Sequence, residues 1–209
     1  MEKYDFKKAL KNYFTADTET VTQVFPPSMQ FLMIDGQGNP ANQPFQDAVA
    51  ALYGIAYGIK MNRKKAGIGP EFSVQNLEGL WWHEKNEPYT GILDERWHWT
   101  LMIGQPDFVT QPDFEQAKAD YVAKKKVPFG IPMRLERFAE GPAIQLLHIG
   151  PYTTETRTVH KLERWMRDNK YGYAGKQHEI YLSDPRKTPP EELRTILRQP
   201  VVQRGYRMY

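Results

Sequence analysis

The chain has 209 residues, enough for one large domain or two small ones, and 28 Lys and Arg against 25 Asp and Glu leave a formal net charge of only +3. Hydrophobic residues make up 40% and charged residues 25%, a balance typical of a folded rather than a disordered protein. The absence of Cys excludes disulfides, thiolate metal sites and a cysteine nucleophile. Aromatic residues are abundant, with five Trp, twelve Tyr and ten Phe, so their positions bear directly on function.

Localisation and nucleic-acid binding follow from the charge and hydropathy pattern. The first residues carry no long apolar run, so we expect no signal peptide, and no segment approaches the ~20 apolar residues of a membrane span. We therefore expect a cytoplasmic protein. The basic runs 63–65 and 124–126 fall at the ends of predicted helices, where cations favour the helix dipole, so we expect no direct nucleic-acid binding. The sequence leaves the oligomeric state open.

The first half begins with a polar N-terminal extension, residues 1–27, whose aromatic residues have loosely helical spacing. Residues 29–34 predict a strand, and the glycine-rich segment 35–40 predicts a turn after it. A long helix is predicted over 44–62, because Pro44 suits a first turn and apolar residues then recur at helical spacing.

Two tyrosines, Tyr53 and Tyr57, lie four residues apart on this helix and flank its apolar stripe. After the helix, 71–82 and 95–103 predict the strands of a hairpin. A second helix is predicted over 112–126.

Four of the five tryptophans fall on this predicted hairpin. Alternation places Trp97 and Trp99 on one face of their strand, whereas the adjacent Trp81 and Trp82 must face opposite sides. The pair at 97 and 99 is compatible with plain core and with the wall of a ligand site, and spacing leaves both interpretations open.

In the second half, 134–138 and 143–149 predict a strand pair broken at a Gly-Pro turn. A helix with its N-terminus near Thr153 or Thr154 follows, and its apolar stripe ends at Met166. Strands are predicted at 178–182 and again from Arg194 to Val202, with a break at Pro200. Along the chain, these elements repeat the order of elements in the first half.

Each half therefore consists of strand, glycine-rich turn, helix, strand and strand. Two such units predict an α+β fold with tandem pseudo-two-fold repeats, repeat one over about 28–126 and repeat two over about 127–209. Together they form a single domain, residues 28–209, with a ligand groove between the repeats.

Known catalytic motifs are missing from the sequence. It lacks the glycine pattern of a phosphate loop, the GxSxG nucleophile elbow and the HExxH zinc motif, and its five histidines are scattered. We therefore expect neither a metal nor a cofactor.

Carboxylate chemistry in an aromatic setting remains. Glu179 shares a strand face with Tyr181, and desolvation on a groove-facing strand would raise its pKa and make it a general base that also attracts cations. The same strand could turn Glu179 to solvent, since either face could point inward. Tyr152, after a Gly-Pro turn, is either at the groove mouth or a packed corner. Glu155 is interpreted as a charge at a helix start.

Five segments together resemble the stand-alone GyrI-like small-molecule-binding proteins over nearly the whole chain. They are residues 29–40, 51–53, 145–152, 178–185 and 195–201. The resemblance implies a tandem strand–helix–strand–strand fold of the SHS2 type with a ligand groove between the repeats. It also implies that Glu179 matches a buried strand glutamate that meets hydrophobic cations.

Some stand-alone members of this family are cyclopropanoid cyclohydrolases, and the aromatic-rich first half is similar to that group. The resemblance implies an enzyme that adds water to the cyclopropane of DNA-alkylating compounds, with aromatic residues holding a flat substrate and a glutamate activating water. On this hypothesis Glu179 is the base, and Tyr152 or Tyr181 donates a hydrogen bond to the developing oxyanion. The predicted ligand-binding residues are Tyr53, Tyr57, Trp81, Trp97, Trp99 and Tyr181.

Two alternatives stay open. The first is a multidrug-binding or sensing module that performs no chemistry, because a binder needs the same aromatic wall and carboxylate. The second is a protein-interaction module. A direct transcription factor is disfavoured, because the 27-residue extension is too short for a DNA-binding domain.

Overall fold

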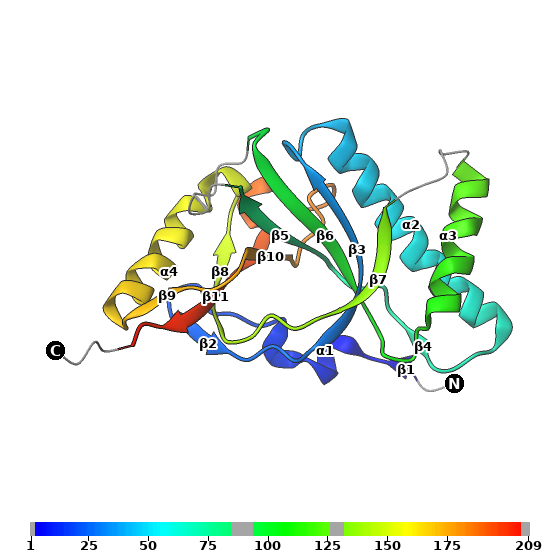
Figure 1. Ribbon diagram of the computed structural model, residues 1–209, viewed down its shortest axis with the longest axis horizontal. Helices are drawn as coiled ribbons and strands as arrows, with labels where there is room; N and C mark the ends of the chain where they lie inside the picture. Colours follow the sequence, from blue (N-terminus) through cyan, green and yellow to red (C-terminus); the bar gives the residue numbers. More distant parts are fainter. Residues whose placement is uncertain (1–2, 85–93, 126–131, 206–209) are drawn as a thin grey trace.

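The computed structural model describes residues 3–84, 94–125 and 132–205, which form one large antiparallel sheet with three long helices (Figure 1). The strands of this sheet are β2 (Thr22–Val24), β3 (Met29–Gln37), β5 (Leu77–His83), β6 (Trp97–Gln105), β7 (Met133–Phe138), β8 (Ala143–Ile149), β9 (Tyr171–Tyr173), β10 (Gln177–Tyr181) and β11 (Arg194–Gln203). The helices are α1 (Phe6–Ala9), α2 (Gln43–Ala66), α3 (Gln111–Lys125) and α4 (Thr156–Asp168), with 3-10 turns η1 (Lys11–Tyr13), η2 (Tyr152–Thr154) and η3 (Pro190–Glu192). The short strands β1 (Lys3–Tyr4) and β4 (Glu71–Phe72) form a separate parallel pair.

The sheet confirms the predicted tandem repeats. One repeat is β3–α2–β5–β6 and the other is β8–α4–β10–β11. The strand order β2-β8-β11-β10-β5-β6-β3-β7 reads as the same unit outward from the centre in both directions. The halves meet where β5 pairs with β10, and Gly79 lies opposite Glu179 in that pairing.

The outer strands correct one prediction. The segments 134–138 and 143–149 do not pair with each other, because β7 pairs with β3, whereas β8 pairs with β11 and β2. The intervening Gly-Pro segment has the composition of a hairpin turn, but β7 and β2 each extend the edge of the opposite repeat. Pairing with a distant strand edge satisfies the same backbone groups as a local hairpin. The exchange ties the two halves together.

The N-terminal residues are also more structured than the predicted loose helix. They form α1, η1 and the strand β2. At the other end of the chain, β11 runs through Pro200 without ending, but there its pairing changes from β8 to β9. Segment 171–173, after the predicted second-half helix, forms the short strand β9.

The two faces of the sheet carry different layers. Helices α2 and α4 cover what we call the front face, with α3 packed on α2, so that α4 and the α2/α3 pair flank the central strands in Figure 1. The buried stripe of α2 includes Leu52, Ile55 and Ile59, and α4 buries Val159 and Leu162 against the same core. The N-terminal segment covers the other, back face.

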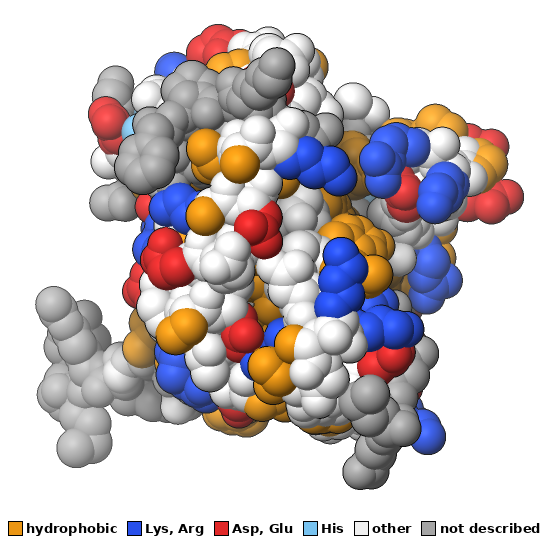
Figure 2. Space-filling view, turned by 90° about the vertical axis from the view of Figure 1, so that its right-hand side faces the viewer, with side chains coloured by type: hydrophobic (Ala, Val, Ile, Leu, Met, Phe, Trp, Pro, Cys, Tyr) orange, Lys and Arg blue, Asp and Glu red, His pale blue; other side chains and the backbone are white. Residues whose placement is uncertain are grey.

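On the face of the molecule drawn in Figure 2, charged side chains of one sign do not form a separate cluster. Figure 2 shows the side of the molecule on the right of Figure 1, where Lys and Arg side chains are interspersed with Asp and Glu and with small hydrophobic patches. Among the described residues, no helix combines the length and apolar character needed to cross a membrane.

A close approach in the first repeat gives a testable prediction. A Cβ built on Gly36 would lie 2.1 Å from the Trp99 ring, whereas a Cβ on Gly104 would meet side chains no nearer than 3.7 Å. Gly36→Ala should therefore displace Trp99 and lower the free energy of unfolding by about 1–3 kcal/mol, the usual cost of overpacking. Gly104→Ala, a control from the neighbouring strand, should change it little. Urea denaturation measures both, and equal effects would contradict the packing described.

Candidate functional site

Glu179 lies at the centre of the sheet on the front face. It is 2% exposed, so the structure decides against a solvent-facing residue. The Tyr181 hydroxyl donates a hydrogen bond to Glu179 Oε2 at 2.6 Å, and Trp81 Nε1 donates to the Tyr181 hydroxyl oxygen at 3.1 Å. The carboxylate is thus held at the end of a chain of two aromatic donors from β10 and β5.

Gly79 leaves the space that this chain of donors needs. A Cβ at Gly79 would lie 2.9 Å from Trp81 Nε1 and 3.2 Å from the Tyr181 hydroxyl. Gly79 lies directly opposite Glu179 in the β5–β10 pairing, so its missing side chain leaves room for Trp81 Nε1 and the Tyr181 hydroxyl beside the carboxylate.

Tyr152 lies over this arrangement, on η2 just before α4. Its ring meets the Tyr181 ring edge to face, with centroids 5.8 Å apart. Burial, followed by the charges of Glu155 and Glu179, raises the pKa of Tyr152 to about 12. Burial and the neighbouring Glu179 also raise the pKa of Tyr181 well above its usual value. Both hydroxyls therefore keep their protons at neutral pH and can act as donors.

Glu155 is a site residue that the sequence analysis missed. It occupies the N-cap position of α4, without a side-chain capping hydrogen bond, and is 1% exposed. After burial, its charge contributes to the raised pKa of both Tyr152 and Tyr181. A glutamate at a helix start already has a local explanation, and only the tertiary structure reveals its burial.

The aromatic wall extends from β5 to the start of α2. The Trp81 ring stacks on Phe45 with centroids 5.8 Å apart and an 18° angle between planes, and Trp99 meets Phe45 edge to face at 5.3 Å. Trp81 and Trp99 thus belong to one aromatic group. Sequence periodicity placed Phe45 only in the core stripe of its helix, so its contact with both tryptophans was not foreseen.

The other predicted ligand-binding residues lie farther out. Trp97 is buried and packs against His83, with centroids 5.8 Å apart. Tyr53 is half-buried and affects the pKa of Tyr152, whereas Tyr57, 6.4 Å from Tyr53 between ring centroids, is 52% exposed. The structure thus groups Glu179, Tyr152, Tyr181 and Trp81, with Tyr53 and Trp99 beside them and the remaining two at the periphery.

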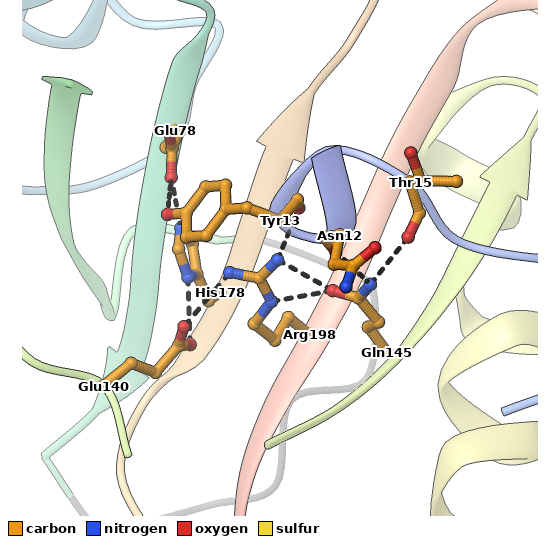
Figure 3. A network of polar contacts seen from close by, with 8 residues as sticks. All are labelled: Asn12, Tyr13, Thr15, Glu78, Glu140, Gln145, His178 and Arg198. Atoms are coloured by element: carbon orange, nitrogen blue, oxygen red, sulfur yellow. Dashed lines mark hydrogen bonds and ion pairs between the residues drawn. The ribbon is translucent and has the colours of Figure 1, made fainter. Parts of the chain in front are cut away.

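Behind the site, on the back face, lies a buried polar network that the sequence analysis did not identify (Figure 3). His178 Nε2 lies 2.9 Å from Glu78 Oε2, and its Nδ1 lies 2.9 Å from Glu140 Oε1. Arg198 Nη1 donates to the other Glu140 oxygen at 3.2 Å. The Tyr13 hydroxyl donates to Glu78 at 2.5 Å.

The network also attaches the N-terminal segment to the sheet. Arg198 donates two bonds to Gln145 Oε1 and one to the Tyr13 carbonyl oxygen, and the Gln145 amide donates to the carbonyl oxygens of Asn12 and Thr15. The sequence signal that could have revealed this network is the presence of charged residues at inward-facing positions of otherwise apolar strands. His178 and Glu179 are neighbours in sequence, so the network and the site share one strand.

This network predicts a pH dependence of stability. Burial alone lowers the pKa of His178, but Glu140 and Glu78 outweigh it and raise the pKa to about 9. A raised pKa contributes stability below the unfolded value, about 6.5, and that contribution is lost as the pH rises through about 9. We expect the free energy of unfolding to fall between pH 7 and pH 9.5, and to fall less in His178→Gln. Equal slopes in denaturation series of both proteins would contradict a charged His178.

Comparison with known proteins agrees with this architecture. A family model described as the GyrI-like small molecule binding domain matches residues 19–202. An uncharacterized conserved protein from Listeria innocua is 40% identical, with a TM-score of 0.85, and the match covers 95% of this chain and 99% of that one. Comparison with curated proteins gives no match.

Two further structures from Listeria innocua are described as hydrolases. One is 39% identical with a TM-score of 0.84, covering 96% of this chain and all of that one. The other is also 39% identical, with a TM-score of 0.80, and covers 95% and 99%. The family match spans most of the sequence and the repeats have the expected topology, so the chain belongs to the GyrI-like small molecule binding domain family.

Proposed function

We propose that this protein binds flat, hydrophobic aromatic molecules, cations included, at Glu179 and hydrolyses cyclopropanoid DNA-alkylating compounds there, protecting the cell against xenobiotics. The observation that carries the proposal is the buried carboxylate of Glu179 at the edge of an aromatic wall. Support comes from the resemblance of the sequence to cyclopropanoid cyclohydrolases and from the similar Listeria proteins described as hydrolases.

The reaction uses Glu179 as general base. It takes a proton from water as the water oxygen attacks a cyclopropane carbon, so a C–O bond forms and the ring C–C bond breaks. The electron pair of the broken bond moves through the conjugated system to the substrate's carbonyl oxygen, which is then protonated. The net change is the addition of one water, and relief of ring strain supplies the driving force.

A tyrosine hydroxyl stabilises the negative charge that develops on the substrate oxygen by donating a hydrogen bond to it. The Tyr181 proton is directed at Glu179, so Tyr152, whose pKa of about 12 keeps it protonated, is the better placed donor to the substrate oxygen. Tyr152 is also 36% exposed, whereas Glu179 is shut off from solvent. A ligand that reaches Glu179 therefore displaces Tyr152 or Tyr181 from its present position. Glu155 adds a second negative charge that favours cationic ligands.

A second function, binding or sensing of multiple drugs without chemistry, uses the same residues. The description of the family as small-molecule binding favours it. Incubation of the protein with a cyclopropane-bearing alkylator, followed by mass spectrometry, separates the two. We expect a product heavier by one water, formed faster than without protein. Tight binding without that product would replace the hydrolase by the binder.

A further inference from the structure

The strand that carries Glu179 also presents a polar group to which no role has been assigned. Gln177 lies two residues before Glu179 on β10 and therefore on the same front face of the sheet. The residue is 5% exposed, and among the described residues its Nε2 has no hydrogen-bond partner. A buried donor without a partner loses its hydrogen bonds to water and gains none in return, so such groups in native structures call for an explanation.

The neighbours of Gln177 belong to the site. In the pairing of β10 with β5 it lies opposite Trp81, and Trp81 in turn lies opposite Trp99 on β6. One row across the front face is therefore Gln177–Trp81–Trp99, and the next row is Glu179–Gly79–Leu101. The first row holds the Gln177 amide and two indole rings, and the second holds a carboxylate next to a glycine whose side-chain space is taken by Trp81 and Tyr181.

We propose that Gln177 is a specificity-determining residue that donates a hydrogen bond to an acceptor oxygen on the ligand, about 7 Å along the strand from the group that faces Glu179. This inference rests on the proposed function and narrows its substrate class. The ligand is a planar molecule that lies beside the stacked Trp81 and Phe45 rings, with an electrophilic or cationic centre at Glu179. About two fused rings away it carries an acceptor carbonyl, distinct from the oxygen that meets Tyr152. A ligand without that carbonyl leaves the Gln177 amide unpaired. Such unpaired groups make a site discriminate strongly against the ligand that lacks the matching acceptor.

A matched pair of dyes tests this directly. The probes are N-methylacridinium and its acetyl derivative, which differ by one carbonyl acceptor, and binding is followed by quenching of their fluorescence. Gln177→Met keeps the side-chain length and removes the donor. Gln105→Met is the control, because Gln105 is an equally buried amide at the far end of β6 on the same face.

We expect Gln177→Met to weaken binding of the acetyl compound about tenfold, the equivalent of one hydrogen bond. Binding of the parent compound should be unchanged or tighter. Gln105→Met should change neither. Equal weakening of both probes by Gln177→Met would overturn the inference, because it would mean that Gln177 only packs. The second variant, Gln177→Leu, must give the same result, and thermal melting confirms that each variant is folded.

The same experiment separates this inference from the proposed function. If the wild-type protein binds both dyes and Gln177→Met treats them alike, the inference fails and the aromatic-cation site stands. If the wild-type protein binds neither dye, the proposed site itself is wrong, and the inference fails with it.

Discussion

Replacing Glu179 with Gln is expected to slow the ring opening of a cyclopropanoid alkylator by roughly two to four orders of magnitude, the usual contribution of a general base. The substitution keeps the size of the side chain and its ability to accept a hydrogen bond from Tyr181, so the fold and the aromatic wall should survive. What it removes is the group that accepts the proton of the attacking water. The rate of product formation, measured by mass spectrometry under single-turnover conditions, is the readout.

A carboxylate outside the site is the control for this substitution. Glu136 lies on the edge strand β7 and is exposed, pairing with Arg134. Glu136→Gln should open the ring at the wild-type rate. A wild-type rate in Glu179→Gln would remove Glu179 from the mechanism, whereas equal loss in both variants would point to damage to the protein rather than to the chemistry.

The second large effect concerns the network behind the site. Arg198→Met should lower the free energy of unfolding by about 3–5 kcal/mol, because breaking a buried ion pair leaves an uncompensated charge. Arg198 is fully buried, and its loss leaves Glu140 Oε2, the Gln145 amide oxygen and the Tyr13 carbonyl without this donor, while His178 still pairs with Glu140 Oε1. Folded proteins are stable by only about 5–15 kcal/mol, so urea denaturation should show a large shift of the midpoint.

Arg134→Met is the matched control for Arg198→Met. Arg134 also pairs with two carboxylates, Asp35 and Glu136, but its side chain is 39% exposed. Surface ion pairs contribute little, so we expect a loss below about 1 kcal/mol. If Arg198→Met costs no more than Arg134→Met, the buried network does not hold the N-terminal segment to the sheet.

Much of the fold follows from the sequence because its signals are local. Helical spacing of apolar residues predicts α2, and alternation predicts the β5–β6 hairpin and its tryptophans. The exchanged edge strands β2 and β7 could not be predicted in this way. Their pairing depends on which distant strand edge is open, and the Gly-Pro segment before β8 reads locally as a hairpin turn.

The features of the site likewise divide into those that local sequence signals predict and those that depend on tertiary packing. Alternation on β10 places Glu179 and Tyr181 on one face, and the resemblance to the family favours that face as the inner one. Neither signal reveals the burial of Glu155 or the unpaired amide of Gln177. Both properties come from the packing of α4 and β5 around them, which is a tertiary effect. His178 went unassigned for the same reason, since its carboxylate partners lie 38 and 100 residues away in the chain.

The most direct test of the account is hydrolysis in water enriched in oxygen-18. Wild-type protein and Glu179→Gln are incubated side by side with a cyclopropane-bearing alkylator, and the product is analysed by mass spectrometry. We expect a product that has gained one labelled water with the wild-type protein and almost none with the variant. Absence of labelled product, or equal amounts from both proteins, would contradict a hydrolytic site built on Glu179.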